Sequence, residues 1–177
     1  NLQSAVDNLV TCASNTWAAS GNAGVTRDDL NIFYGSSAVI VNTTKAGQGA
    51  THTIDYSHLL FDKNDYTVSL RLLLTSGSPT AQVTFTLGKF TNKVATTAMM
   101  NRNSWTPVVL RNTAVADPNE SSITGSVVVQ TLGTNSNDVG ALFSIDGLQL
   151  SEGSFPADFV GPNQIRKGGE VSWMVGD

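Results

Sequence analysis

The chain has 177 residues, enough for a single domain with a sizeable core. Its net charge of −4 and pI of about 5.0 exclude the basic surface that nucleic-acid binding requires, and no apolar run approaches the roughly 20 residues of a membrane helix. Charged residues make up only 14%, against roughly 25% in an average domain. Ser, Thr and Asn take their place, and with many Val residues they favour strands and turns over helices.

The first residues differ from the rest of the chain. Leu2, Val6 and Leu9 are spaced four and three apart, as in the seam of a coiled coil, so residues 1–11 are interpreted as a short N-terminal stalk or helix, or as a linker. A frayed first strand is the alternative. The single cysteine, Cys12, excludes an intrachain disulfide and is either a buried apolar residue or a bond to a second chain.

Short strands separated by turn signals follow in order. Residues 30–41 are expected to form two strands around Gly35-Ser36-Ser37, and residues 45–49 a loop. The other expected strands span residues 50–60, 66–74, 81–87, 93–99, 106–111, 122–132 and 141–150. Roughly eight to ten strands without a helix predict a sandwich or barrel over residues 12–160, and residues 161–177 read as an extended C-terminal arm.

Two strands show the clearest alternation of apolar and polar residues. In residues 66–74 and 81–87 every second residue is apolar, so each strand has one face toward a core. We expect the two strands to pair antiparallel and to share a polar face. That face would carry Arg71, Gln82, Thr84 and Thr86, which are hydrogen-bonding groups without an aromatic ring.

The last predicted strand contains a change of spacing. Phe143 and Ile145 are two apart, but the next apolar residue, Leu148, comes three positions later. Because side chains alternate faces, one extra residue is needed for all of them to face one core. Asp146-Gly147 is the predicted bulge, since glycine accepts the positive φ that a bulge requires.

Four segments in the same order resemble carbohydrate-binding jelly-roll modules of the galactose-binding-like type. They are Asn8-Leu9-Val10 with Trp17, residues 65–70, Ser104-Trp105-Thr106 with the strand after it, and residues 143–153 with Pro156 and Phe159. The closing segment is similar to the ending found in bacteriophage tail fibres, tailspikes and related virion proteins. The resemblance implies an antiparallel jelly-roll β-sandwich that binds sugars or builds virion structure, without catalysis.

The resemblance also implies a candidate site for a structural calcium ion. Such modules often hold a structural calcium between an acidic residue of the first strand and an Asp of the last strand, and Asp146 fits the second position. The first position, around residues 13–16, has no carboxylate. Asp146 is therefore either a calcium ligand or a bulge residue that accepts hydrogen bonds from backbone N–H groups. No other cofactor is expected.

Sugar binding needs an aromatic ring for the apolar side of the sugar, with polar groups around it. Phe33 and Tyr34 are adjacent and cannot both face inward on a strand, so Tyr34 is the favoured platform, with Tyr56 second. Arg71 and Gln82 are the expected hydrogen-bonding partners. The other aromatic residues with an expected role belong to the core: Trp17, Tyr66, Phe85, Trp105 and Phe143.

Catalytic arrangements are not expected. His52 and His58 share a face of a strand, but Asp55 does not, so they form neither a triad nor a metal site. The carboxylate pairs Asp28-Asp29 and Asp62/Asp65 stand in turn-like sequence, where Asp is common for backbone reasons.

The leading hypothesis is a non-enzymatic bacteriophage virion protein, either a tail-fibre or spike module or a capsid decoration, that acts in adhesion or particle reinforcement. It would form a homo-oligomer, expected to be a trimer, contact other virion proteins and meet a cell-surface glycan. The alternative is a carbohydrate-binding module that targets an attached enzyme to a polysaccharide.

Overall fold

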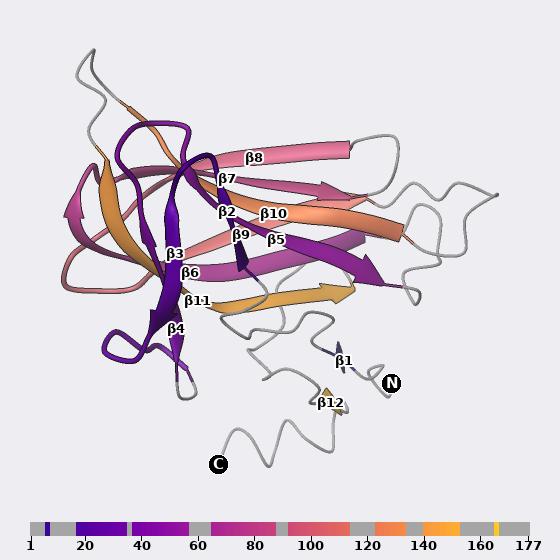
Figure 1. Ribbon diagram of the computed structural model, residues 1–177. Coiled ribbons are helices and arrows are strands. Elements are labelled where there is room, and N and C mark those ends of the chain that lie inside the picture. The colour runs from indigo at the N-terminus through magenta and orange to yellow at the C-terminus, as the bar shows by residue number, and fades with distance from the viewer. Residues whose placement is uncertain are drawn as a thin grey trace.

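The computed structural model describes residues 6–7, 17–34, 37–56, 65–87, 92–113, 123–133, 140–152 and 165–166. Every regular element in these residues is a strand, and two five-stranded antiparallel sheets face each other as a sandwich (Figure 1). The predicted all-β, jelly-roll-like sandwich is therefore confirmed. Within the same residues, no helix is long and apolar enough to cross a membrane.

The two sheets are named here after their central strands. The β10 sheet has the order β2 (Trp17–Ser20), β5 (Gly49–Tyr56), β10 (Ile123–Thr131), β7 (Thr80–Leu87) and β8 (Asn92–Met99). The β11 sheet has the order β3 (Gly24–Asp28), β4 (Ala38–Asn42), β11 (Ala141–Glu152), β6 (Asp65–Gly77) and β9 (Thr106–Thr113).

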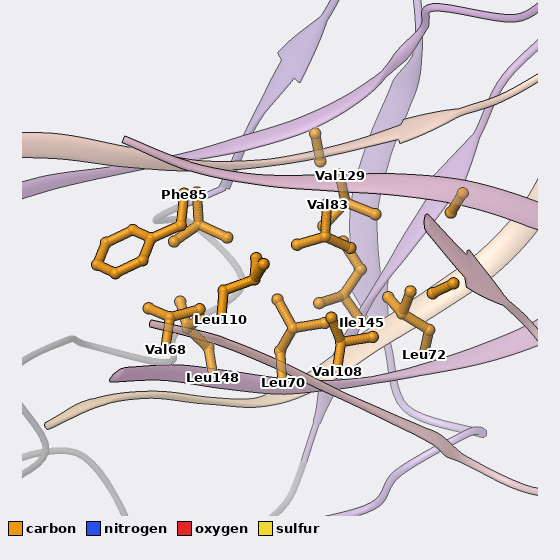
Figure 2. Close-up of a cluster of buried hydrophobic side chains, with 14 of the residues drawn as sticks. Val68, Leu70, Leu72, Val83, Phe85, Val108, Leu110, Val129, Ile145 and Leu148 are labelled. Carbon is orange, nitrogen blue, oxygen red and sulfur yellow. The ribbon is translucent and has the colours of Figure 1, made fainter. Parts of the chain in front are cut away.

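The core lies between the sheets. Figure 2 shows Val68, Leu70 and Leu72 of β6 pointing toward Val83 and Phe85 of β7 in the opposite sheet. Each of these side chains is fully or almost fully buried, which stabilises the fold by roughly 1.5–3 kcal/mol per side chain. The predicted core positions of four aromatic residues are confirmed: Trp17, Tyr66, Phe85 and Phe143.

The predicted bulge in β11 is also confirmed. Asp146 pairs with Arg71 and Gln149 with Ser69, so β11 advances three residues where β6 advances two. Gly147 has a φ of 64°, a left-handed conformation in which a β-carbon is disfavoured. The extra residue lets Ile145 and Leu148 both face the core, while Asp146 lies on the outer face.

The predicted pairing of residues 66–74 with residues 81–87 is wrong. β6 pairs with β11 and β9, whereas β7 pairs with β10 and β8 in the other sheet. The chain crosses between the sheets after Gly77, and the crossing is held by hydrogen bonds from Ser78 N–H to the Gly140 carbonyl and from Met100 N–H to the Pro79 carbonyl. The alternation of apolar and polar residues identifies which face of a strand lies toward the core, but not which strand it pairs with. In a sandwich, the core faces of two strands can meet from opposite sheets.

Within the described residues 30–34 and 37–41, the structure has one strand instead of the two predicted, because residues 30–34 are not paired in a sheet and only β4 (Ala38–Asn42) is. At the chain ends, β1 (Val6–Asp7) pairs with β12 (Ile165–Arg166) and lies next to β11 (Figure 1). The described part of the N-terminal segment is thus strand, as in the alternative interpretation. The remaining seam residues, Cys12 and residues 167–177 of the arm lie outside the described residues.

Candidate functional site

Exposed apolar side chains concentrate at the outer face of the β11 sheet. Among the described residues, five large apolar side chains are exposed, and three of them, Leu30, Phe33 and Tyr34, stand in the loop after β3. A fourth, Val109, points outward from β9 at 48% exposure. Clustered exposed apolar groups mark interaction surfaces more often than scattered ones do.

The loop after β3 begins with a capped turn. The Asp28 carboxylate accepts hydrogen bonds from the backbone N–H groups of Leu30 (2.9 Å) and Asn31 (3.0 Å), and the Ser144 hydroxyl donates to it at 2.6 Å. Burial raises the pKa of Asp28, but the hydrogen bonds from Ser144, Asn31 and Leu30 outweigh it and hold the pKa below its ordinary value. A charged carboxylate therefore fixes the start of the loop.

Asp146 fixes the end of the same loop. One of its oxygens accepts hydrogen bonds from the backbone N–H groups of Phe33 (2.8 Å) and Tyr34 (2.9 Å), and the other accepts from Gly147 N–H (2.7 Å). The carboxylate is buried on the outer face beneath the loop. Hydrogen bonds of this charge-assisted kind are strong, so the loop is held against the sheet at two points.

The held loop builds an aromatic cluster with a cation. The guanidinium carbon of Arg71 lies 4.3 Å from the centroid of the Phe33 ring, and Phe33 contacts Trp105 edge-on with centroids 6.0 Å apart. Phe33 and Tyr34 remain 40% and 43% exposed, and Trp105 is half-buried. We call Phe33, Tyr34, Arg71 and Trp105 the Phe33 surface. It offers an exposed aromatic ring beside a guanidinium, a combination suited to a flat, polar ligand.

Two of the four predicted sugar contacts lie on the same side of the β11 sheet: the backbone N–H of Tyr34 binds Asp146, which is the register partner of Arg71. Tyr34 and Arg71 both lie in the Phe33 surface. Gln82 lies on the outer face of the opposite sheet, between its register partners Gln130 and Thr97, so the predicted face shared by Arg71 and Gln82 does not exist. Tyr56 ends β5 in that same sheet, and its side chain is outside the described residues.

Two residues of the site were missed. Trp105 was predicted to be core, but it lies just before β9, is half-buried and contacts Phe33 of the loop. Phe33 was left undetermined because its neighbour Tyr34 was preferred; neither ring is in the core. Adjacency of two aromatic residues in a loop was the available signal, and their contacts with Arg71 and Trp105 depend on the tertiary fold.

A metal is not needed to explain Asp146, because both of its oxygens accept backbone hydrogen bonds. No group of three or more His, Cys, Asp and Glu residues suited to a metal ion occurs in the described part of the chain. Calcium at Asp146 stays a prediction.

Three residues that were considered for catalysis, His52, Asp29 and Asp65, lie in the described part of the chain. His52 is buried against Trp17, with ring centroids 5.5 Å apart. Asp29 is paired with Arg27, and Asp65 with Arg111 at 2.7 Å. His58 and Asp62 lie outside the described residues. His52 therefore packs in the interior, and Asp29 and Asp65 each form an ion pair with an arginine.

An open pocket of about 650 Å³ lies at the end of the sandwich, away from the carboxylates of the loop. Its lining is mostly apolar: Leu74, Gly77, Pro79, Met99, Met100, Asn101 and Arg102. Because none of the lining residues is aromatic, it is a weaker candidate for sugar binding than the Phe33 surface.

No protein-family model and no curated protein matches the sequence. The fold is similar to that of solved carbohydrate-binding modules. The C-terminal family 22 module of Clostridium thermocellum Xyn10B has a TM-score of 0.57 at 19% identity, with 82% of this chain and 91% of that chain covered. The CBM22-1 xylan-binding domain of Paenibacillus barcinonensis Xyn10C has a TM-score of 0.53 at 15% identity, covering 88% and 97%.

A third similar structure is TmCBM61 in complex with β-1,4-galactotriose, with a TM-score of 0.53 at 16% identity and coverage of 80% and 92%. Nothing in these comparisons points to a phage origin. The virion and trimer hypotheses therefore rest on the sequence: the closing motif, the N-terminal seam and the low content of charged residues. At these identities the likeness concerns the fold alone: the chain has a two-sheet β-sandwich similar to that of these carbohydrate-binding modules.

Proposed function

We propose that this domain is a non-catalytic carbohydrate-binding module and that a glycan lies against its Phe33 surface. The observation that carries the proposal is the exposed Phe33 ring against Arg71, followed by the exposed Tyr34, in a loop segment whose backbone is held by the Asp146 carboxylate. The fold shared with xylan-binding and galactotriose-bound modules supports the same function class.

The division of roles follows from the geometry. Tyr34 is 43% exposed, so its ring can receive the apolar side of a sugar. Arg71 supplies N–H donors for sugar oxygens. Asp146 holds the backbone of both Phe33 and Tyr34 before a ligand arrives, which lowers the entropy lost on binding.

The proposal does not depend on where the domain works. A virion module and an enzyme's targeting module would use the same surface, and the sequence resemblance suggests both. The similar solved structures favour the targeting role.

A glycan array followed by calorimetry tests the proposal, with wild type, Tyr34→Ala and Gln82→Ala. Gln82 is the matched control because it is polar and partly exposed on the opposite sheet. We expect Tyr34→Ala to weaken binding at least tenfold, about 1.4 kcal/mol, and Gln82→Ala to change it less than about twofold. Absence of any bound glycan at millimolar concentration, or a larger loss in Gln82→Ala, would refute the proposal.

A further inference from the structure

Arg71 differs from its neighbours in how its charge is balanced. Arg27 is paired with the Asp29 carboxylate and Arg111 with the Asp65 carboxylate. Within the described residues, no carboxylate forms an ion pair with Arg71, although the side chain is half-buried in the Phe33 surface. A cation kept at a surface without a protein counter-ion is suited to an anionic ligand.

The carboxylate opposite Arg71 in the sheet, that of Asp146, binds backbone N–H groups and not Arg71. Asp146 is the register partner of Arg71 across β11 and β6. Its two oxygens accept hydrogen bonds from Phe33, Tyr34 and Gly147 backbone N–H groups. The fold thus places a carboxylate beside Arg71 and directs it to the loop backbone, which leaves the guanidinium without that partner.

The contact with Phe33 is an aromatic one and leaves the N–H groups of the Arg71 guanidinium available to a ligand. The guanidinium carbon lies 4.3 Å from the ring centroid, so the cation contacts the aromatic ring, and the described part of the chain shows no hydrogen bond from the guanidinium. Its N–H groups lie in the guanidinium plane and can bind the two oxygens of a planar carboxylate side by side. A neutral hydroxyl can use only one or two of these donors.

We infer that the ligand of the Phe33 surface is an acidic glycan, in which the carboxylate of a uronic acid unit pairs with Arg71 while a sugar ring lies against Tyr34. The inference rests on the proposed carbohydrate-binding function and specifies its ligand class. Because the chain carries a net charge of −4, an acidic polymer is repelled by the molecule as a whole, and the local cation has to provide the attraction.

Calorimetry with matched ligand pairs tests the inference. Oligogalacturonate and a glucuronic-acid-substituted xylan oligosaccharide are each compared with their methyl esters, which keep the sugar and remove the charge. We expect wild type to bind at least one acidic form about 10- to 100-fold more tightly than its ester, as for hydrogen bonds to charged groups. Raising the salt concentration should narrow this difference.

Three variants separate a ligand contact from a structural role. Arg71→Gln should weaken binding of the acid much more than binding of the ester, because Gln keeps an N–H donor for sugar oxygens but not the charge. Arg71→Lys should keep part of the preference for acid, because Lys retains the charge without the planar fork. Arg111→Gln removes an arginine of the same face that is already paired with Asp65, and it should leave the preference intact. Thermal melting checks that each variant is folded.

The outcomes are distinct. Equal wild-type affinity for acid and ester, binding of neutral glycans or sulfated oligosaccharides only, or an equal loss for both ligand forms in Arg71→Gln would overturn the acidic-ligand inference while leaving carbohydrate binding in place. Binding of no glycan of any class would overturn the proposed function itself, and the inference with it.

Discussion

The Asp146 carboxylate is the group on which the site depends most, and its replacement gives the sharpest prediction. Asp146→Ala removes the acceptor of three backbone hydrogen bonds, from Phe33 (2.8 Å), Tyr34 (2.9 Å) and Gly147 (2.7 Å). A hydrogen bond to a charged group contributes roughly 1.5–3 kcal/mol. Since the freed Phe33 and Tyr34 N–H groups can reach water once the loop lifts, we expect a loss of about 2–4 kcal/mol in unfolding free energy, below the full sum.

Urea unfolding followed by tryptophan fluorescence measures this loss, and calorimetry with a bound glycan measures its effect on the site. Asp146→Asn keeps one oxygen that can accept from the loop, so its loss should be about half as large. The control is Asp65→Asn, which weakens a partly exposed ion pair with Arg111 but keeps an oxygen that can accept from the Thr113 hydroxyl, so it should cost only about 1 kcal/mol. If Asp146→Ala were no more destabilising than Asp65→Asn, or left glycan affinity unchanged, the loop would not be held as described.

Further predictions concern the bulge, the core and acid pH. Gly147→Ala forces a β-carbon into a φ of 64° and should lower the unfolding free energy by about 1–2 kcal/mol in urea titrations; a neutral effect would contradict the bulge geometry. Phe143→Ala opens the core at a fully buried ring and should cost about 3–5 kcal/mol by the same measurement, whereas a cost below about 1 kcal/mol would mean that the ring is not buried. The folded-state pKa of Asp28 is lowered, so its contribution is present above its unfolded pKa and is lost as pH falls through the folded value. Stability of wild type should therefore drop below about pH 4 more steeply than that of Asp28→Asn, and equal slopes would show that Asp28 is not linked to folding.

Much of the fold could be predicted from the local pattern of apolar and polar residues. The alternation in residues 66–74 and 81–87 predicted two strands with the correct core faces, and the three-residue step from Ile145 to Leu148 predicted the bulge. Both inferences concern which face a side chain occupies, and that is a property of the nearest few residues. Strand partners are decided by long-range packing. The assumption that β6 and β7 form a hairpin therefore failed, since the crossing after Gly77 takes the chain into the other sheet.

The candidate site was predictable only in pieces. Tyr34 and Arg71 were each identified from the sequence, but the hydrogen bond that brings them together joins Tyr34 N–H to Asp146, 112 residues away. Trp105 was misplaced for the same reason: its exposure to the outer side depends on Phe33, which that distant carboxylate holds in place. Gln82 was grouped with Arg71 because neighbours in sequence were taken as neighbours in space.

Glycan titration followed by ¹⁵N–¹H NMR tests the location and existence of carbohydrate binding most directly. The molecule carries its own control: the indole N–H of Trp105 belongs to the Phe33 surface, whereas Trp17 is buried at 7% exposure beside His52. We expect the glycan to shift the signals of Phe33, Tyr34 and the Trp105 indole and to leave those of Trp17 and Gln82 unchanged. Shifts gathered around Gln82 on the opposite sheet, or none at millimolar glycan, would contradict the proposed binding at the Phe33 surface.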